Sequence, residues 1–383
     1  MEDIITWTDN SPLSVRWMKL LSQQPEDKKF NYQMRRIRNP TKEQETCINT
    51  VGSFQCVSSS QEYVGIGWGG ESPCGGCYRS EFTVLTARET TCMDHKIPDL
   101  GGRIAPMITT IRNWLFVCGG DYTSSCMKLD MNADNPSWSS FVSLPWAARH
   151  GTLETHGDYM YAMGGYNSGT CYNYHYRISA TGTAWEVRAG YPINIHRHRA
   201  VVDHTNARIY SFGGDWCGST RHESYYYTVS DNTWTGISGL PWGAKRDVAA
   251  AVIKQKNEEE WIVLMTYSHN AVYYWNLETN QGFYHIGNSY DLKNDGMFML
   301  AMTPYTGFLV GGWTNKDHVH LINWWVYNSE KKKFEKVYRY LQNNHRWGYW
   351  TRAATTYRAL HNCRAERTYA ALGWGGRNVV SRT

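Results

Sequence analysis

The sequence predicts an all-β protein built from repeated small sheets, and three observations carry this prediction. Aromatic residues are abundant, with 18 Trp and 27 Tyr among 383 residues, and aromatic side chains favour strands. The 34 Gly residues supply the tight turns that many short strands need. A Gly-Gly doublet also recurs along the chain at intervals close to 50 residues, which indicates a structural repeat.

The doublets define the repeat, and each ends an apolar, strand-like segment. They stand at Gly69-Gly70, Gly119-Gly120, Gly164-Gly165, Gly213-Gly214, Gly311-Gly312 and Gly375-Gly376. The intervals between second glycines are 50, 45, 49, 98 and 64 residues. Because 98 is twice 49, one repeat has lost its doublet, and residues 261–267 supply the expected strand there. A period near 50 is the length of one four-stranded propeller blade.

Other positions recur in register with the doublets. An aromatic residue falls 18 to 22 residues after the second glycine, at Trp138, Trp185, Trp234 and Phe334, and Phe283 takes this place in the repeat without a doublet. A proline then opens the next repeat, and an arginine follows it four or five residues later. With these features the chain resembles the kelch-repeat family over nearly its whole length. The resemblance implies a β-propeller in which the glycines let the second strand end where blades crowd and the late aromatic packs between blades.

We therefore expect residues 1–383 to form a single kelch-type β-propeller domain of seven four-stranded blades, or six if residues 47–95 do not form a blade. Residues 1–20 read as the outer strands of the last blade, so the N-terminal segment would complete the C-terminal blade and close the ring. Such closure removes exposed sheet edges. Residues 21–46 read as an irregular connection, and residues 47–376 as successive blades.

Composition excludes several classes of function. The net charge of +5, from 39 basic and 34 acidic side chains, argues against a dedicated nucleic-acid binder. No apolar run is long enough to span a bilayer, so membrane insertion is not expected. The sequence contains no phosphate-binding loop, nucleophile elbow or zinc-protease helix, and we expect no cofactor and no metal site. The protein is expected to be a monomer or part of a larger chain.

The repeated arginines are the candidate ligand-binding residues: Arg103, Arg149, Arg197, Arg246 and Arg352. A position that repeats in a propeller forms a ring around the axis, and guanidinium groups that face one funnel favour carboxylate or phosphate. In the kelch-type ubiquitin-ligase adaptors that the repeat resembles, similar arginines bind acidic peptide segments. The alternative is that each arginine braces its own blade by bonding to loop carbonyls.

The ten cysteines suggest disulfides and an oxidising compartment. The first candidate pair is Cys118 with Cys126, which lie across one Gly-Gly hairpin, and Cys47 and Cys56 are also candidates. No Asn lies in a glycosylation triplet and no signal peptide is recognisable, so free buried cysteines remain the alternative. The compartment stays open, with a lean towards the extracellular side.

The preferred function is a non-catalytic binding scaffold that uses one propeller face, with an acidic peptide or an acidic glycan as partner. The alternative is an enzyme that acts on a small anionic or sugar-like substrate, as do the kelch propellers that resemble sialic-acid mutarotases or copper radical oxidases. No catalytic residue is assigned, although His150 and His198 adjoin the arginines and are the acid–base candidates. Tryptophans that flank the doublets, such as Trp216, are expected to pack between blades or to form a stacking rim for sugars or peptides.

Overall fold

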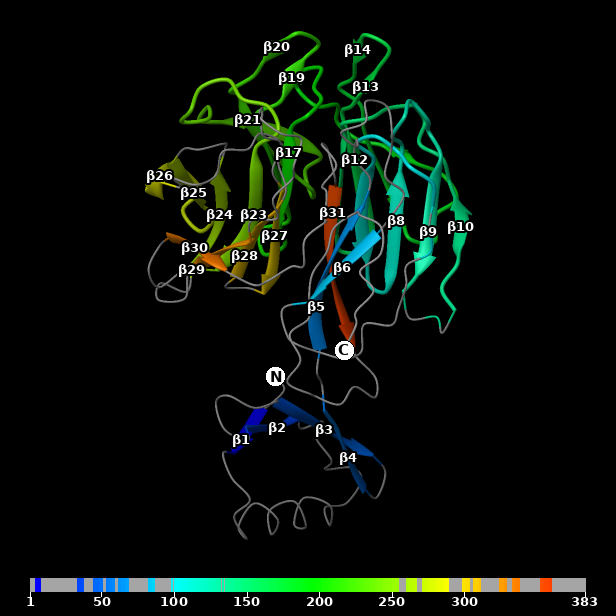
Figure 1. Cartoon of the computed structure of the whole chain (residues 1–383), viewed down its shortest axis with the longest axis vertical. Helices are drawn as coiled ribbons and strands as arrows, with labels where there is room; N and C mark the ends of the chain where they lie inside the picture. The colour runs from blue at the N-terminus through cyan, green and yellow to red at the C-terminus, as the bar shows by residue number, and fades with distance from the viewer. Residues whose placement is uncertain are drawn as a thin grey trace, which may run out of the picture. The chain divides into compact units, whose positions relative to one another are not determined.

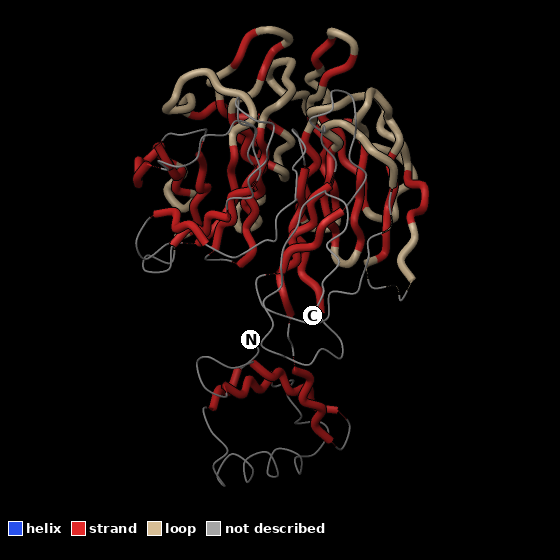
Figure 2. The backbone as a smooth tube through the Cα atoms, viewed as in Figure 1, coloured by secondary structure: helices blue, strands red, loops and turns tan. Residues whose placement is uncertain are grey.

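The computed structural model describes residue 98, residues 100–254 except 132 and 134, residues 260–266 and 271–288, and the strands that lie outside these ranges. The chain divides into two compact units, residues 1–62 with 358–364 and residues 63–357 with 365–383. In the described residues every regular element is a strand (Figure 2). None of them forms a helix that is long and apolar enough to cross a membrane.

The first unit contains one four-stranded sheet in the order β1-β2-β3-β4. Its strands are β1 (Ile4–Trp7), β2 (Gln33–Ile37), β3 (Gln44–Thr50) and β4 (Ser53–Ser58). Strand β1 runs parallel to β2, whereas the other pairs are antiparallel. Residues 21–46 were expected to be irregular, but pairing with β1 and β3 makes residues 33–37 a strand. The role of residues 1–20 in the last blade stays a prediction, because Gly375 and Gly376 lie outside the described residues.

The second unit contains repeated four-stranded antiparallel sheets (Figure 1). The first sheet holds β7 (Met107–Ile111), β8 (Trp114–Cys118), β9 (Cys126–Asp130) and β10 (Trp138–Phe141). The second holds β11 (Thr152–His156), β12 (Tyr159–Met163), β15 (His175–Ser179) and β16 (Glu186–Val187). The third holds β17 (Arg199–Asp203), β18 (Arg208–Phe212), β21 (Ser224–Thr228) and β22 (Thr233–Ile237).

Two further four-stranded sheets and one three-stranded sheet follow in this unit, which also contains two short two-stranded hairpins. The fourth sheet holds β23 (Ala249–Lys254), β24 (Trp261–Thr266), β25 (Ala271–Asn276) and β26 (Gln281–Asn288). The fifth holds β27 (Phe298–Thr303), β28 (Thr306–Val310), β29 (Trp324–Asn328) and β30 (Lys333–Val337). The last holds β31 (Arg352–Ala359), β5 (Gln61–Trp68) and β6 (Phe82–Thr86), in that order. The repeat expected over residues 47–95 is therefore divided, because β3 and β4 belong to the first unit whereas β5 and β6 pair with β31.

The glycine doublets work as the repeat pattern predicts. In the three described doublets both glycines have positive φ, for example 64° at Gly164 and 115° at Gly165. A Cβ on Gly164 would lie 2.6 Å from the carbonyl oxygen of Ile195, which leads into the next sheet. No side chain fits at that distance, so glycine is required where neighbouring repeats meet.

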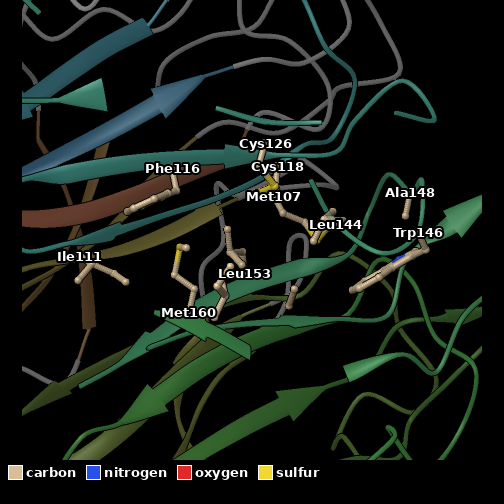
Figure 3. Close-up of a cluster of buried hydrophobic side chains, with 12 residues drawn as sticks. Met107, Ile111, Phe116, Cys118, Cys126, Leu144, Trp146, Ala148, Leu153 and Met160 are labelled. Atoms are coloured by element: carbon tan, nitrogen blue, oxygen red, sulfur yellow. A yellow bond between two sulfur atoms is a disulfide. The ribbon is translucent and has the colours of Figure 1, made fainter. Parts of the chain in front are cut away.

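Apolar packing joins successive sheets. One buried cluster combines Met107 and Phe116 of the first sheet with Leu153 and Met160 of the second (Figure 3). The late tryptophans also tie adjacent repeats together, since the indole Nε1 of Trp185 donates to the carbonyl oxygen of Val142 at 3.1 Å. The first strands β7, β11, β17, β23 and β27 contact one another in sequence, which places them innermost. The predicted all-β fold of repeated sheets is confirmed.

Candidate binding face

The loops that follow the doublets gather at one end of the sheets (Figure 2). Two short hairpins project there, β13 (Tyr166–Asn167) with β14 (Thr170–Cys171) and β19 (Asp215–Trp216) with β20 (Ser219–Thr220) (Figure 1). We call this end the loop face, and it consists of residues 119–125, 144–151, 164–174, 191–198, 213–223 and 240–247. Backbone hydrogen bonds connect each loop to the segment that leads into the next innermost strand. For example, the N–H of Gly120 donates to Ala148 O at 2.9 Å.

A chain of backbone hydrogen bonds fixes the register of the repeats on this face. The N–H of His150 donates to the carbonyl of Ala105, that of Arg197 to His150, and that of Asp247 to Arg197, at 3.0, 2.8 and 2.9 Å. All four residues have positive φ, between 45° and 60°. They therefore occupy one equivalent position, which we call the left-handed position.

This register corrects the predicted arginine ring. Arg149 and Arg246 lie one residue before the left-handed position, Arg197 occupies it, and Arg103 lies two residues before it. The four arginines thus stand at three different positions of the repeat. At the position of Arg149 and Arg246, the intervening repeat carries His196 instead. The side chain of Arg352 lies outside the described residues.

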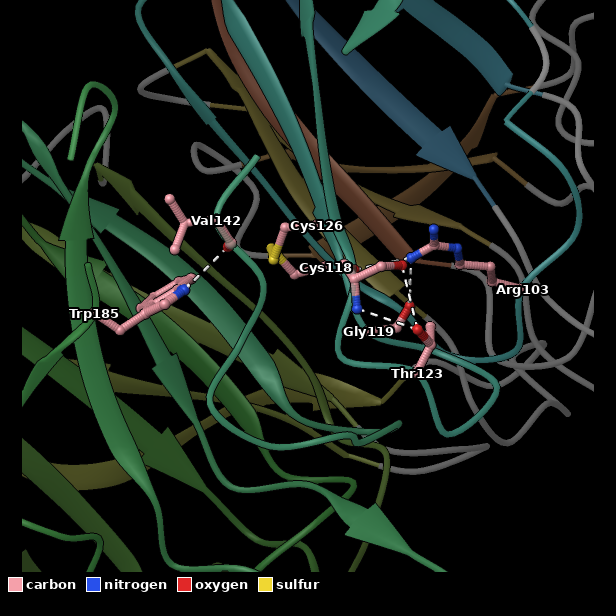
Figure 4. The surroundings of a disulfide bond; sticks show 8 residues. Arg103, Cys118, Gly119, Thr123, Cys126, Val142 and Trp185 are labelled. Carbon is pink, nitrogen blue, oxygen red and sulfur yellow. Dashed lines mark hydrogen bonds between the residues drawn. A yellow bond between two sulfur atoms is a disulfide. The ribbon is translucent and has the colours of Figure 1, made fainter. Parts of the chain in front are cut away.

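Two of the arginines brace the fold. The Nη1 of Arg103 donates to the carbonyl oxygens of Gly119 and Ser125 at 3.0 and 3.1 Å, so it holds the first doublet loop (Figure 4). Burial lowers the pKa of Arg103, while Asp121 opposes that shift. Arg197 forms a buried ion pair with Asp247. The Nε of Arg197 donates to Asp247 Oδ2 at 2.8 Å, and the Nη2 of Arg197 donates to the same oxygen. These contacts support the bracing interpretation for both side chains.

Two arginines support aromatic rings at the loop face: Arg149 of the predicted set, and Arg221, which the sequence did not single out. The guanidinium carbon of Arg149 lies 4.4 Å from the ring centroid of Tyr122 and 5.5 Å from that of Tyr166. Arg221 lies 4.5 Å from the ring centroid of Trp216 in the same way. Tyr122 and Trp216 are 40% and 48% exposed. The sequence left two alternatives for Trp216, packing between blades or a stacking rim for a ligand, and in the structure this side chain is exposed.

A polar cluster lies beside Trp216, at the residue that precedes it and in the two segments that lead into the neighbouring innermost strands. Arg246 donates from Nη1 to Asp215 Oδ2 at 3.1 Å, and the Asp215 carboxylate is buried. The neighbouring His196 has its Nδ1 3.2 Å from Sγ of Cys171. A disulfide sulfur has no proton to give, so Nδ1 donates and Nε2 of the neutral ring carries the acceptor lone pair. Burial lowers the pKa of His196 to about 4, and the charge of Asp215 opposes that shift.

Disulfides fix the loops of this face. The predicted bond between Cys118 and Cys126 is present, with the Cα atoms 4.1 Å apart (Figure 4). A second bond joins Cys171 to Cys217, whose Cα atoms lie 5.7 Å apart, and it links the hairpins of adjacent repeats. In the sequence, both cysteines fall in the loop that follows a glycine doublet, and this shared loop position is the signal that could have indicated the second pair. Cys47 and Cys56 stand directly opposite each other in β3 and β4, and their bond stays a prediction.

A second group of polar residues lies on the innermost strands. Burial raises the pKa of Glu154 on β11 to about 7, and Arg199 on the adjacent β17 opposes the shift. No sequence motif marked either residue. The predicted acid–base candidates are both buried, and Nε2 of His198 is hydrogen-bonded to Thr152 Oγ1 at 3.1 Å. Among the described residues, no group of three His, Cys, Asp or Glu side chains is placed to hold a metal.

The repeated four-stranded antiparallel sheets, the glycine doublets and the tryptophans between repeats define a kelch-type β-propeller fold. The chain is similar to a solved structure described as "Structure of YjhT", with 14% sequence identity and a TM-score of 0.50. The match covers 64% of this chain and 86% of that one. No protein-family model matches the chain. No curated protein matches it.

Proposed function

We propose that the chain is a non-catalytic binding module that holds its partner on the loop face. The observation that carries this proposal is the pair of exposed rings, Tyr122 and Trp216, each supported by an arginine. Each ring directly follows an aspartate, Asp121 or Asp215, whose N–H donates to a carbonyl in the segment that leads into an innermost strand. The two rings therefore occupy equivalent positions two repeats apart. Tyr, Trp and Arg are the residues that most often dominate binding energy.

The acidic partner predicted from the sequence now depends on fewer arginines. Arg103 and Arg197 serve the fold, which leaves Arg149 and Arg246 among the predicted arginines whose side chains the structure describes, while Arg352 stays a prediction. Both have a carboxylate neighbour, since Arg149 interacts with the charge of Asp121 and Arg246 bonds to Asp215. We therefore assign recognition mainly to the aromatic rings, and we retain acidic groups on a peptide or glycan as a secondary contribution.

The test is a binding screen of the full chain against glycan and peptide arrays. Trp216→Ala should abolish retention of the partner that the parent protein binds. Tyr284→Ala is the matched control, because Tyr284 is 43% exposed but belongs to β26 and not to the loop face. Equal retention by the parent and the Trp216→Ala protein would refute the loop face as the binding surface.

A second candidate function rests on Glu154 and Arg199. A carboxyl group that titrates near neutral pH on an innermost strand is suited to move protons on a sugar-like substrate. The test is sugar anomer exchange followed by NMR, with Glu154→Gln as the variant. Exchange that the parent accelerates and the variant does not would favour this enzyme over the binding module.

We also propose that the propeller closes as a ring of six blades. The order β31-β5-β6 supports this, because it pairs a C-terminal strand with an N-terminal strand that ends at the first doublet. Deleting residues 352–383 would expose the edge of β5, and exposed edges promote aggregation. A truncated protein as soluble as the parent would refute closure by this pairing.

A further inference from the structure

The loop face carries two equivalent aromatic platforms. The N–H of Asp121 donates to Ile104 O and that of Asp215 donates to His196 O, so the residues that follow each aspartate, Tyr122 and Trp216, match in register. Each ring has a guanidinium over one face, at 4.4 and 4.5 Å, yet remains nearly half exposed. Such a ring is held in place and still offers surface to a partner. The C–H groups of a sugar ring complement the negative face of an aromatic ring.

The polar atoms beside the Trp216 platform form a mixed set of donors and acceptors. Arg246 is held by the buried carboxylate of Asp215, which also accepts from Gly218 N, and the half-exposed guanidinium presents N–H donors. His196 directs its proton to Cys171, so its other nitrogen is an acceptor. A hydroxyl group both donates and accepts, so this set suits hydroxyl groups better than it suits a carboxylate, which only accepts.

Most charged side chains of the loop face have an opposite charge beside them. Asp121 lies near both Arg103 and Arg149, Arg221 pairs with Glu223 at 3.4 Å, and two further arginines pair with Asp215 and Asp247. A strong positive potential, which would gather acidic partners, needs charges of one sign. An acidic partner would also compete with these existing ion pairs.

The disulfide between Cys171 and Cys217 stiffens this surface. Cys217 directly follows Trp216, and its bond ties the hairpin of that tryptophan to the hairpin of the preceding repeat. A loop that is ordered before binding loses less entropy when the ligand arrives. The tryptophan platform is thus preorganised.

From these contacts we propose that the loop face binds an uncharged, hydroxyl-rich glycan, with sugar rings stacked on Trp216 and Tyr122 and hydroxyl groups bonded to the polar cluster beside Trp216. This inference rests on the proposed binding function and names the class of its ligand. Aromatic platforms supply the apolar contact, and compensated charges make binding insensitive to salt.

The experiment is calorimetric titration of the full chain with neutral trisaccharides of glucose, galactose, mannose and N-acetylglucosamine, at 50 and 500 mM NaCl. At least one should bind, with affinities at the two salt concentrations that agree within about twofold. Trp216→Ala and Tyr122→Ala should each weaken binding about tenfold, a loss that corresponds to about 1.4 kcal/mol. The Tyr284→Ala control should bind as the parent does, and thermal melting should show that all three variants are folded.

Four outcomes would overturn the inference. If no neutral trisaccharide binds, or if binding survives both substitutions, the stacked glycan is wrong. If only an acidic saccharide or peptide binds, and salt weakens it through the same two rings, the uncharged ligand is wrong but the binding function stands. If the array screen finds a partner that the Trp216→Ala protein retains as well as the parent does, both proposals fail together.

Discussion

Replacing Asp247 with alanine tests whether the repeated arginines are structural. The ion pair of Arg197 and Asp247 is buried, with side chains 9% and 5% exposed. Asp247→Ala leaves the guanidinium buried without its carboxylate, and removal of one partner of a buried pair costs about 3–5 kcal/mol. The double variant Arg197→Met with Asp247→Asn removes both charges, keeps at position 247 a residue that tolerates the positive φ, and should recover much of this loss because no unmatched charge remains.

The assay is urea unfolding of each full-length variant at constant pH and salt. The matched control is the ion pair of Arg112 and Asp158, which is 74% and 67% exposed, and Asp158→Ala should cost about 0–1 kcal/mol. A loss below about 1 kcal/mol for Asp247→Ala would refute the bracing role. Arg197 would then return to the set of candidate ligand-binding residues.

Three further predictions concern packing, redox state and pH. Gly164→Ala should destabilise the fold more than Gly157→Ala in urea, because both have positive φ but only Gly164 faces a carbonyl at 2.6 Å; equal losses would contradict the glycine argument. Mild reductant should open the bond of Cys171 with the exposed Cys217 before the buried bond between β8 and β9, which alkylation and mass spectrometry would detect, and simultaneous opening would contradict this order. Burial lowers the pKa of His175 to about 4, so below pH 6.5 the unfolded chain binds a proton that the folded chain does not. The free energy of unfolding should therefore fall by about 3 kcal/mol as the pH is lowered from 6.5 to 4. His175→Gln should flatten this pH dependence of urea unfolding, and an unchanged slope would refute the assignment.

The sequence predicted the fold well where the signals are local. A doublet needs two positive φ values and close approach of the next repeat, and only glycine allows both at positions such as Gly164. The late tryptophan recurs because its indole bonds across to the preceding repeat, as Trp234 does to Ala189 O at 2.9 Å. The repeated sheets follow directly from these two constraints.

The candidate site was harder to predict because register decides it. The proline-to-arginine spacing does not define the register, because Arg103, Arg197 and Arg246 each lie five residues after a proline, yet the backbone hydrogen bonds place them at three different positions of the repeat. The sequence also did not pair Cys171 with Cys217, because the two cysteines lie 46 residues apart and meet only when adjacent repeats pack together. Glu154 carries no motif, and its pKa reflects burial that only the fold creates.

Hydrogen–deuterium exchange of the full chain, with and without the partner found by array screening, tests most directly that the loop face is the functional surface. We expect slower exchange in the loops at residues 121–124, 166–171 and 215–221 when the partner is bound, because they carry the exposed rings and the disulfide-linked hairpins. Protection confined to β11 and β17, where Glu154 and Arg199 lie, would contradict the account and favour a channel enzyme instead.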